Sequence, residues 1–407
     1  MKKIFLLSCS LLAAAFVFAQ YKNDNVLFKT VYAQDLCNEL NVHPKFLLLD
    51  VRTPGEYSDT SSRGLNLGRF KNAVNIEVSE LGKRISELST YKDQPVFVYC
   101  SHSQRSRRAS KMLADSGFKQ VFNINGGMTG LRQLPVDDNK CLYDRLETGN
   151  NYNLISAADL CDKLARSAKN IFLLDVRNDS AFNHISTDAK INAYGYFKNS
   201  VNIPFADLEK NMGRIPMGKE IIITDLFGGD ASKAAILLRQ NNYQNVSVLL
   251  EGIDRVLYTD SRTLPCLATA YVSDMPYKII NAIDLKRFIE TNKDYVFLDA
   301  RTTEEFTNKH KNYWQNIGHL VNAVNIPSAD LETQWNKIGA YKTKPVIIYA
   351  FSSSTPSYEA ANLLVKKGFT NVMVLQGGIF NVGWTAANVK GCSSLASLRI
   401  DIPAENQ

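Results

Sequence analysis

One pattern occurs three times in this chain of 407 residues, at a spacing of about 125 residues. The first block is FLLLDVRTPGEY at 46–57, FLLDVRNDSAF at 172–182 and VFLDARTTEEF at 296–306. The second block is KNAVNIEVSEL at 71–81, KNSVNIPFADL at 198–208 and VNAVNIPSADL at 321–331. A third block, an apolar run followed by a helical pattern, begins at 95, 220 and 345. A unit of this length can bury its own core, which predicts tandem domains and excludes a solenoid.

Within each unit, short apolar runs alternate with helical patterns. The run Val96–Tyr99 is uninterrupted, as is typical of a strand buried on both faces of a parallel sheet. We therefore predict an α/β fold in which each domain is a parallel sheet covered by helices on both faces. The predicted boundaries place domain 1 at 20–148, domain 2 at 149–271 and domain 3 at 272–407.

The first 19 residues have the pattern of a signal peptide. Lys2 and Lys3 precede an apolar run at 4–18, and Ala19 stands at the predicted cleavage site. A retained anchor is the alternative, although about 15 apolar residues are short for a span of roughly 20. A lipoprotein modified at Cys9 is a further alternative. We expect an exported protein, located in a bacterial periplasm, with no membrane span after cleavage.

The net charge makes nucleic acid an unexpected partner. Loss of Lys2 and Lys3 with the signal peptide lowers the formal charge from +7 to +5, and no polybasic block remains. The sequence does not define an oligomeric state.

The segment PVFVYCSHSQRS at 95–106 carries the candidate chemistry. Cys100 stands directly after the apolar run and directly before a short polar, basic loop, which is followed by a predicted helix at 107–116. In an open α/β sheet, ligands bind at the carboxyl ends of the strands, and the free N–H groups of a helix start favour an anion or a thiolate. We therefore expect Cys100 to be a nucleophile. The competing interpretation is an inert buried thiol.

The D-V-R block, the V-N-I-P-like block and the loop C-x-x-x-x-R-S after an apolar strand resemble the rhodanese (sulfurtransferase) family. The resemblance covers nearly the whole mature chain, three times over. It implies an enzyme whose loop cysteine accepts a sulfane sulfur as a persulfide and passes it to cyanide or to a protein or low-molecular thiol. A small anion such as thiosulfate is the expected donor, mercaptopyruvate remains an alternative, and no cofactor is required.

The loop from Cys100 to Arg105 can curl so that its backbone N–H groups point inward at an anion. With the role that the resemblance implies, we predict Cys100 as nucleophile and sulfur carrier and Arg105 as anion binder, and we expect Ser106 to cap the following helix. The C-x4-R spacing is one residue shorter than the C-x5-R of phosphatase chemistry, which favours sulfur over phosphorus. The remaining predicted substrate-binding positions are Ser101, His102, Ser103, Gln104 and Ser106.

The second and third copies lack this chemistry. Asp225 and Ala350 stand where Cys100 stands, and neither loop contains an arginine. Domains 2 and 3 are therefore predicted to be inactive and kept for architecture or partner contact. An exported binding or scaffold protein is thus the alternative function. Redox cycling of Cys100 through a sulfenic acid or a mixed disulfide is a third hypothesis.

Asp50 and Arg52 have counterparts in all three copies, including the two without a cysteine: Asp175 and Arg177, and Asp299 and Arg301. Their presence in inactive copies predicts a structural role, in which charge-assisted hydrogen bonds tie neighbouring loops together.

The other cysteines follow the repeat. Cys37 is equivalent to Cys161, and Cys141 is equivalent to Cys266 and Cys392, while Lys286 replaces the third helix cysteine. Our hypothesis pairs Cys37 with Cys141 and Cys161 with Cys266, and an alternative pairs Cys141 with Cys161. The cysteines have neither C-x-x-C spacing nor neighbouring histidines, so no metal site is predicted.

Overall fold

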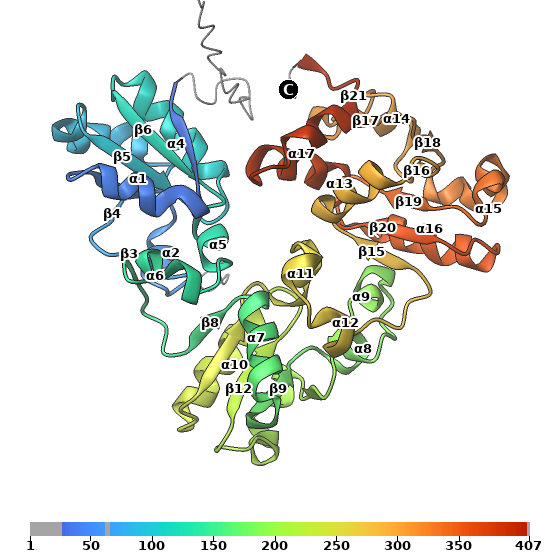
Figure 1. The fold of residues 1–407 in the computed structure, drawn as a ribbon, viewed down its shortest axis with the longest axis horizontal. Helices are drawn as coiled ribbons and strands as arrows, with labels where there is room; N and C mark the ends of the chain where they lie inside the picture. The colour runs from blue at the N-terminus through green and yellow to red at the C-terminus, as the bar shows by residue number, and fades with distance from the viewer. Residues whose placement is uncertain (1–26, 62–65, 405–407) are drawn as a thin grey trace, which may run out of the picture.

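The structure, a computed structural model, describes residues 27–61 and 66–404 (Figure 1). The predicted signal peptide lies outside this part of the chain. Three lobes follow one another in sequence around a common centre (Figure 1). Within the described ranges, no helix has the length and hydrophobicity needed to cross a membrane.

Each lobe contains a five-stranded parallel sheet with the same strand order, which confirms the predicted α/β fold with three tandem domains. In domain 1 the order is β1 (Lys29–Tyr32), β6 (Gln120–Asn125), β5 (Pro95–Tyr99), β2 (Leu47–Asp50) and β4 (Val74–Asn75). In domain 2 it is β8 (Asn153–Ile155), β13 (Val246–Leu249), β12 (Glu220–Thr224), β9 (Ile171–Asp175) and β11 (Val201–Asn202). In domain 3 it is β15 (Lys278–Ile280), β20 (Val372–Leu375), β19 (Val346–Tyr349), β16 (Val296–Asp299) and β18 (Val324–Asn325).

A short antiparallel ribbon closes each domain. The pairs are β3 (Arg69–Phe70) with β7 (Leu146–Glu147), β10 (Tyr196–Phe197) with β14 (Tyr271–Val272), and β17 (His319–Leu320) with β21 (Arg399–Ile400). These ribbons could not be predicted from the sequence, because a strand of two residues is too short to show the alternation of apolar and polar residues. Each ribbon fixes the last residues of a domain against its middle.

The helices cover the sheets and also recur in the three domains. Domain 1 has α1 (Leu36–Val42), α2 (Pro54–Tyr57), α3 (Leu81–Arg84), α4 (Gln104–Asp115), α5 (Gly127–Arg132) and α6 (Lys140–Tyr143). Domain 2 has α7 (Ala157–Ser167), α8 (Asp179–Phe182), α9 (Ala189–Ala193), α10 (Gly229–Gln240), α11 (Gly252–Tyr258) and α12 (Leu267–Ala270). Domain 3 has α13 (Ala282–Thr291), α14 (Thr303–Phe306), α15 (Leu331–Gln334), α16 (Thr355–Lys366) and α17 (Gly378–Asn388). The longest 3-10 segments of the described residues are Ile85–Tyr91, Glu209–Arg214, Trp335–Tyr341 and Ser393–Leu398.

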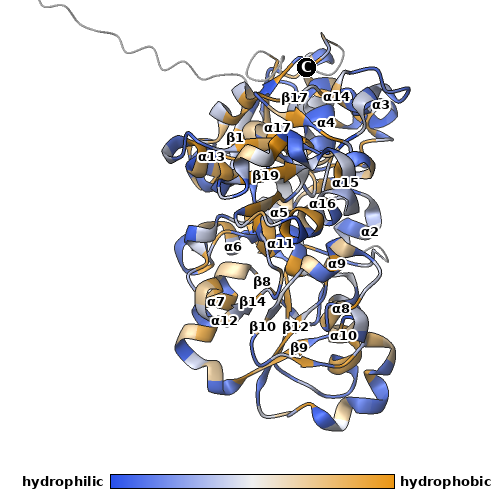
Figure 2. Cartoon of the chain, turned by 90° about the vertical axis from the view of Figure 1, so that its right-hand side faces the viewer, coloured by the Kyte–Doolittle hydropathy of each residue, from blue (hydrophilic) through white to orange (hydrophobic). Residues whose placement is uncertain are grey.

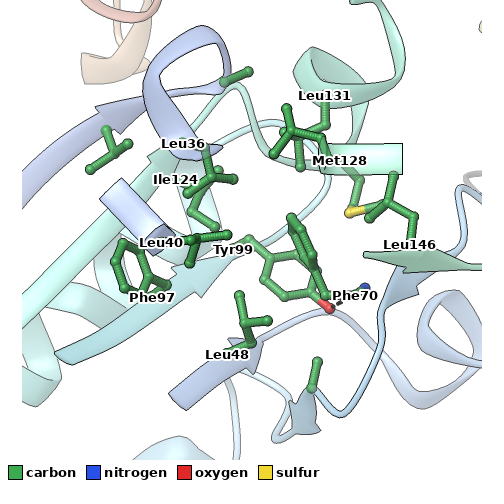
Figure 3. Close-up of a cluster of buried hydrophobic side chains, with 14 of the residues drawn as sticks. Leu36, Leu40, Leu48, Phe70, Phe97, Tyr99, Ile124, Met128, Leu131 and Leu146 are labelled. Carbon is green, nitrogen blue, oxygen red and sulfur yellow. Dashed lines mark hydrogen bonds between the residues drawn. The ribbon is translucent and has the colours of Figure 1, made fainter. Parts of the chain in front are cut away.

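Strand β5 is buried on both faces, as its sequence predicts. Phe97 and Tyr99 point to one face, where Phe97 stacks on Phe122 with ring centroids 4.6 Å apart and the Tyr99 hydroxyl accepts from the Phe70 N–H (Figure 3). Val96 and Val98 point to the other face. Burying each large apolar side chain contributes about 1.5–3 kcal/mol, so this strand is a rigid support for the loop that follows it.

Helices α5, α11 and α17, which start at equivalent positions of the three repeats, meet near the centre of the molecule (Figure 1). Figure 2 shows apolar residues along the strands and around α5 and α11, and polar residues on the outer helices. The domains are joined in a closed ring. The hydrogen bonds that join them include Arg255 to Gln133, Gln376 to Asp254, and Asn125 to the carbonyl oxygen of Asn388.

Candidate active site

Cys100 is the first residue after β5, at the carboxyl edge of the domain 1 sheet. Only 1% of its surface is exposed, and it packs on the core of one sheet face. The adjacent loop leads directly into α4. The thiol is therefore held at the position where an α/β sheet binds ligands.

The loop brings a backbone N–H group to the thiol. The N–H of Ser103 lies 3.1 Å from the Cys100 Sγ. Ser103 has a φ of +116°, a rare value for a residue other than glycine, and its hydroxyl donates to Asn125 at 2.5 Å. Such strain costs on the order of 1–3 kcal/mol and is typical of functional sites. Here it turns an N–H group inward toward sulfur.

The expectation that Ser106 caps the helix is wrong. Helix α4 begins at Gln104, three residues before the predicted start, and its N-cap residue is Ser103. Ser106 lies in the first turn, fully buried, and its hydroxyl donates to Asn123 at 2.7 Å and to the Ser103 carbonyl at 2.9 Å. The chain enters the helix directly after the strained residue, which turns Ser106 toward β6. Gln104 is exposed at the helix start.

Arg105 is anchored to Glu56 of α2. Its Nη1 and Nη2 atoms donate to the two carboxylate oxygens of Glu56, each at 2.7 Å, and Nη2 also donates to the Ser101 hydroxyl at 2.8 Å. Burial acts to raise the pKa of Glu56, but hydrogen bonding and charge from Arg105 outweigh it and lower this pKa to about 2. The guanidinium thus stiffens the loop, and the role of Arg105 as anion binder stays a prediction.

His102 connects Ser101 of the loop to domain 2. The His102 Nδ1 atom lies 3.0 Å from the Ser101 hydroxyl oxygen, and its Nε2 atom lies 2.8 Å from a carboxylate oxygen of Glu251 in domain 2. Ser101 is buried, whereas the His102 side chain is 40% exposed. The structure therefore brings the predicted loop residues together with a carboxylate that the sequence analysis did not identify.

Helix α5 fixes the loop backbone. The N–H groups of Met128 and Thr129 donate to the carbonyl oxygens of Cys100 and Ser101, both at 2.9 Å. Gly127 has a φ of +56°, and a Cβ atom there would lie 2.6 Å from the Ser101 carbonyl oxygen. Only glycine permits this close approach, which explains why glycine stands at this place in all three repeats.

Domain 2 shows what the loop holds in place of a thiol. Asp225 follows β12 as Cys100 follows β5, and its carboxylate accepts from the N–H groups of Gly228, Asp230 (2.8 Å) and Ala231 (3.0 Å). Burial raises the pKa of Asp225, against the effect of these hydrogen bonds. This loop is an anion cradle occupied by its own side chain. Ala350 in domain 3 offers no comparable group.

Asp50 and Arg52 form a fully buried ion pair beside the site. Arg52 Nη2 lies 2.7 Å from the Asp50 carboxylate and 2.7 Å from the Gly68 carbonyl oxygen. Domains 2 and 3 repeat these contacts with carbonyl oxygens at Gly195 and Gly318. The pair ties the end of one strand to the segment before the next, as the structural interpretation expects.

Four cysteines of domains 1 and 2 lie in disulfide pairs that join the start of each domain to its end. Cys37 pairs with Cys141, with Cα atoms 6.3 Å apart, and Cys161 pairs with Cys266, with Cα atoms 5.1 Å apart. Cys392 is a buried free thiol. This is the first of the two connectivities that the repeat suggested.

A pocket of about 380 Å³ lies beside His102. Its walls include Phe227 from the domain 2 loop, Ser352 from the domain 3 loop, and Phe380 and Trp384 from α17. Phe227 and Phe380 are more than half exposed. The active loop therefore faces an apolar surface that all three domains build.

The sequence analysis missed two asparagines that support the loop. Asn123 and Asn125 are buried in β6, where they accept from Ser106 and Ser103. The equivalent positions hold Val248 and Leu250 in domain 2 and Val374 and Gln376 in domain 3. Both asparagines stand at positions where domain 2 has apolar residues. This difference between the repeats could have identified them from the sequence.

A three-fold parallel α/β repeat with one cysteine loop defines the class of this protein. A family model for the rhodanese-like domain matches residues 31–134, 156–257 and 281–386, which is more than half of the chain. The protein therefore belongs to the rhodanese-like domain family and contains three copies of the domain.

Curated relatives match single parts of the chain. The uncharacterized protein YqhL of Bacillus subtilis is 37% identical over 83 residues, which cover 20% of this chain and 58% of that protein. A tRNA uridine(34) hydroxylase of Cytophaga hutchinsonii is 30% identical over 130 residues, which cover 29% of this chain and 39% of that protein. The chain thus spans less than two thirds of either relative.

Among solved structures, a thiosulfate sulfurtransferase from Pseudomonas aeruginosa is 15% identical, with 86% of this chain and 66% of that chain covered and a TM-score of 0.22. A rhodanese from E. coli with anions is 28% identical, with 21% and 91% covered and a TM-score of 0.18. With TM-scores this low, the family assignment depends on the family model.

Proposed function

We propose that the protein is a sulfurtransferase that carries a sulfane sulfur as a persulfide on Cys100. The sulfur comes from thiosulfate or a similar anionic donor and goes to cyanide or to a thiol. Three features support this proposal: membership of the rhodanese-like family, the position of Cys100 at the carboxyl edge of the sheet, and the N–H group that faces its sulfur.

The observation that carries the proposal is the contrast between Cys100 and Asp225. The equivalent loop of domain 2 gives three N–H groups to a carboxylate, and these hydrogen bonds favour the charged form of Asp225, although burial outweighs them and raises its pKa. In domain 1 the same position holds a thiol, and a persulfide anion on that thiol would receive the same stabilisation.

The proposed reaction is a double displacement in which charge and atoms balance. The Cys100 thiolate attacks the outer sulfur of thiosulfate, a new S–S bond forms, the S–S bond of thiosulfate breaks, and its electron pair leaves with sulfite. Cyanide then attacks the outer sulfur of the persulfide, thiocyanate leaves, and the thiolate returns. No oxidant or cofactor enters either step.

The compartment forms part of the proposal. The signal-like segment at 1–19 and the two disulfide pairs fit a protein that acts outside the reducing cytosol. The name of the hydroxylase relatives suggests a different reaction, on a tRNA uridine, but those matches cover 20–34% of this chain.

The test is thiocyanate formation from thiosulfate and cyanide, together with the intact mass of the protein after exposure to donor alone. We expect the wild type to gain the mass of one sulfur atom and Cys100→Ser to gain none and form no thiocyanate. Cys392→Ser removes the other buried free thiol and should retain activity. Absence of a persulfide with thiosulfate, mercaptopyruvate and polysulfide would reject the proposal.

A binding or scaffold role is the second candidate, because two of the three domains lack a nucleophile in the loop. It predicts no sulfur on Cys100 and no loss of function in Cys100→Ser. The mass measurement on the wild type and on this variant therefore separates the two functions.

A further inference from the structure

Glu251 has an unusual backbone for its residue type. It precedes α11 in the left-handed region with a φ of +54°, and the equivalent residues before α5 and α17 are Gly126 (φ +79°) and Gly377 (φ +77°). A side chain is unfavourable in this conformation, and glycine is the usual residue. Domain 2 thus places a carboxylate where the other two domains place no side chain.

The Glu251 carboxylate reaches into domain 1. Its Oε1 atom lies 2.8 Å from the His102 Nε2 atom and accepts from the Thr129 hydroxyl, also at 2.8 Å. The side chain is 16% exposed. Burial acts to raise the pKa of Glu251, but His102, Arg255 and Thr129 outweigh it and lower the pKa to about 2. The group is therefore an anion at neutral pH.

This contact continues to the reactive loop. An ionised carboxylate can only accept, so the His102 Nε2 atom donates to Glu251, while the other ring nitrogen, Nδ1, lies within hydrogen-bond distance of the Ser101 hydroxyl. The Ser101 oxygen in turn accepts from Arg105. One chain of hydrogen bonds thus runs from domain 2 to the residue that follows Cys100.

We propose that Glu251 is a positioning residue for the active loop of domain 1, which it holds through His102 and Ser101. The inactive second domain thereby completes the active site of the first. The inference depends on the proposed function only for its sulfur-transfer measurement. Strain at Glu251 is the expected signature of such a role, since a side chain held in an unfavourable backbone conformation marks a functional constraint.

The test variant is Glu251→Gly, which gives domain 2 the residue that the other repeats carry. Glycine suits this backbone, which offsets part of the loss of the contacts to His102 and Thr129, so we expect the protein to stay folded with a melting temperature lowered by at most about 5 °C. We expect sulfur transfer to fall about tenfold, mainly in kcat, because the loop loses its outer support. Glu251→Gln still accepts from Thr129 and His102, and should retain more than about a third of the activity.

A second measurement is independent of any sulfur donor. Cys100 lies buried beneath the loop, so a loosened loop should raise its rate of alkylation by iodoacetamide about fivefold, as read from the mass of the Cys100 peptide. If no donor loads the wild type, the proposed function fails while this measurement still tests Glu251. Unchanged alkylation in Glu251→Gly overturns the positioning role, whatever sulfur transfer does.

Three further variants separate this role from a general effect of the domain interfaces. Lys390→Ala removes an exposed ion pair to Asp35 between domains 3 and 1 that contacts neither Glu251 nor the loop, and both rates should stay within about twofold. His102→Ala and the double variant His102→Ala with Glu251→Gly should have equal rates, because Glu251 acts through His102. Fully additive losses would overturn the proposal.

Discussion

The Arg105 guanidinium binds both carboxylate oxygens of Glu56, with two hydrogen bonds of 2.7 Å each. The two residues lie 49 positions apart, on α4 and α2. Glu56 is itself fixed by a capping box with Thr53 at the start of α2. The arginine of the C-x-x-x-x-R loop is thus anchored to a neighbouring element, and its contact with Ser101 passes this rigidity to the residue after Cys100.

Replacement of Arg105 by lysine should lower kcat/KM for sulfur transfer about tenfold, because a single ammonium group cannot bind both Glu56 oxygens and Ser101 in a planar array. Steady-state assays with thiosulfate and cyanide measure this. Arg108→Lys, on the exposed face of the same helix, is the matched control and should leave the rate unchanged. Full activity in Arg105→Lys would contradict the anchoring role.

Acid should weaken the protein through Glu56. Its pKa is lowered in the folded state from an ordinary value of 4.5 to about 2, so the unfolded chain binds the proton more tightly. The stabilisation is complete above pH 4.5 and is lost as the pH falls toward 2, for a total of about 3 kcal/mol. Urea unfolding at pH 7 and pH 3 would show a smaller acid loss in Glu56→Gln than in the wild type. Equal losses would argue against the pair.

Asp225→Asn should destabilise domain 2 by about 1–3 kcal/mol, because the amide group turns N–H donors toward backbone N–H groups that need an acceptor. Chemical unfolding followed by hydrogen exchange at Ala231 would measure the loss. Sulfur transfer at Cys100 should be retained. A variant as stable as the wild type would mean that this loop does not favour an anion, which would also weaken the argument for the Cys100 cradle.

The buried ion pair should be important for stability in every domain. Asp299→Ala leaves Arg301 buried without its partner, and we expect a loss of about 3–5 kcal/mol in the free energy of unfolding. The exposed pair of Lys83 and Glu80 provides the comparison, since Glu80→Gln should cost about 0–1 kcal/mol. Similar losses for both variants, measured in urea, would reject the structural role of the Asp-x-Arg block.

Removal of the Cys37–Cys141 disulfide should lower the stability of domain 1 by about 2–5 kcal/mol, because the bond closes a loop with a sequence separation of 104. The double serine variant can be compared with the wild type under non-reducing conditions. Peptide mapping without reductant checks the connectivity itself, and recovery of a Cys141–Cys161 peptide would replace it with the alternative pairing.

The repeat made much of this protein predictable. The strand before Cys100 could be predicted because Val96–Tyr99 is apolar without interruption. The absence of a loop cysteine from domains 2 and 3 could be seen because Asp225 and Ala350 align with Cys100. The start of α4 and the role of Ser106 could not be predicted from the sequence. Both depend on the strained backbone of Ser103, which packing against Asn125 in β6 maintains and which no local propensity indicates.

The sequence by itself determined that the chain has three domains of one family and that one of them has a cysteine directly after its central strand, because repeats and apolar periodicity are local properties of a chain. Only the tertiary structure decided what surrounds that cysteine. His102 and Glu251 are 149 positions apart and belong to different domains. The contact between these two residues depends on how the folded domains pack around a common centre. That packing produces no periodic pattern in the sequence from which it could be predicted.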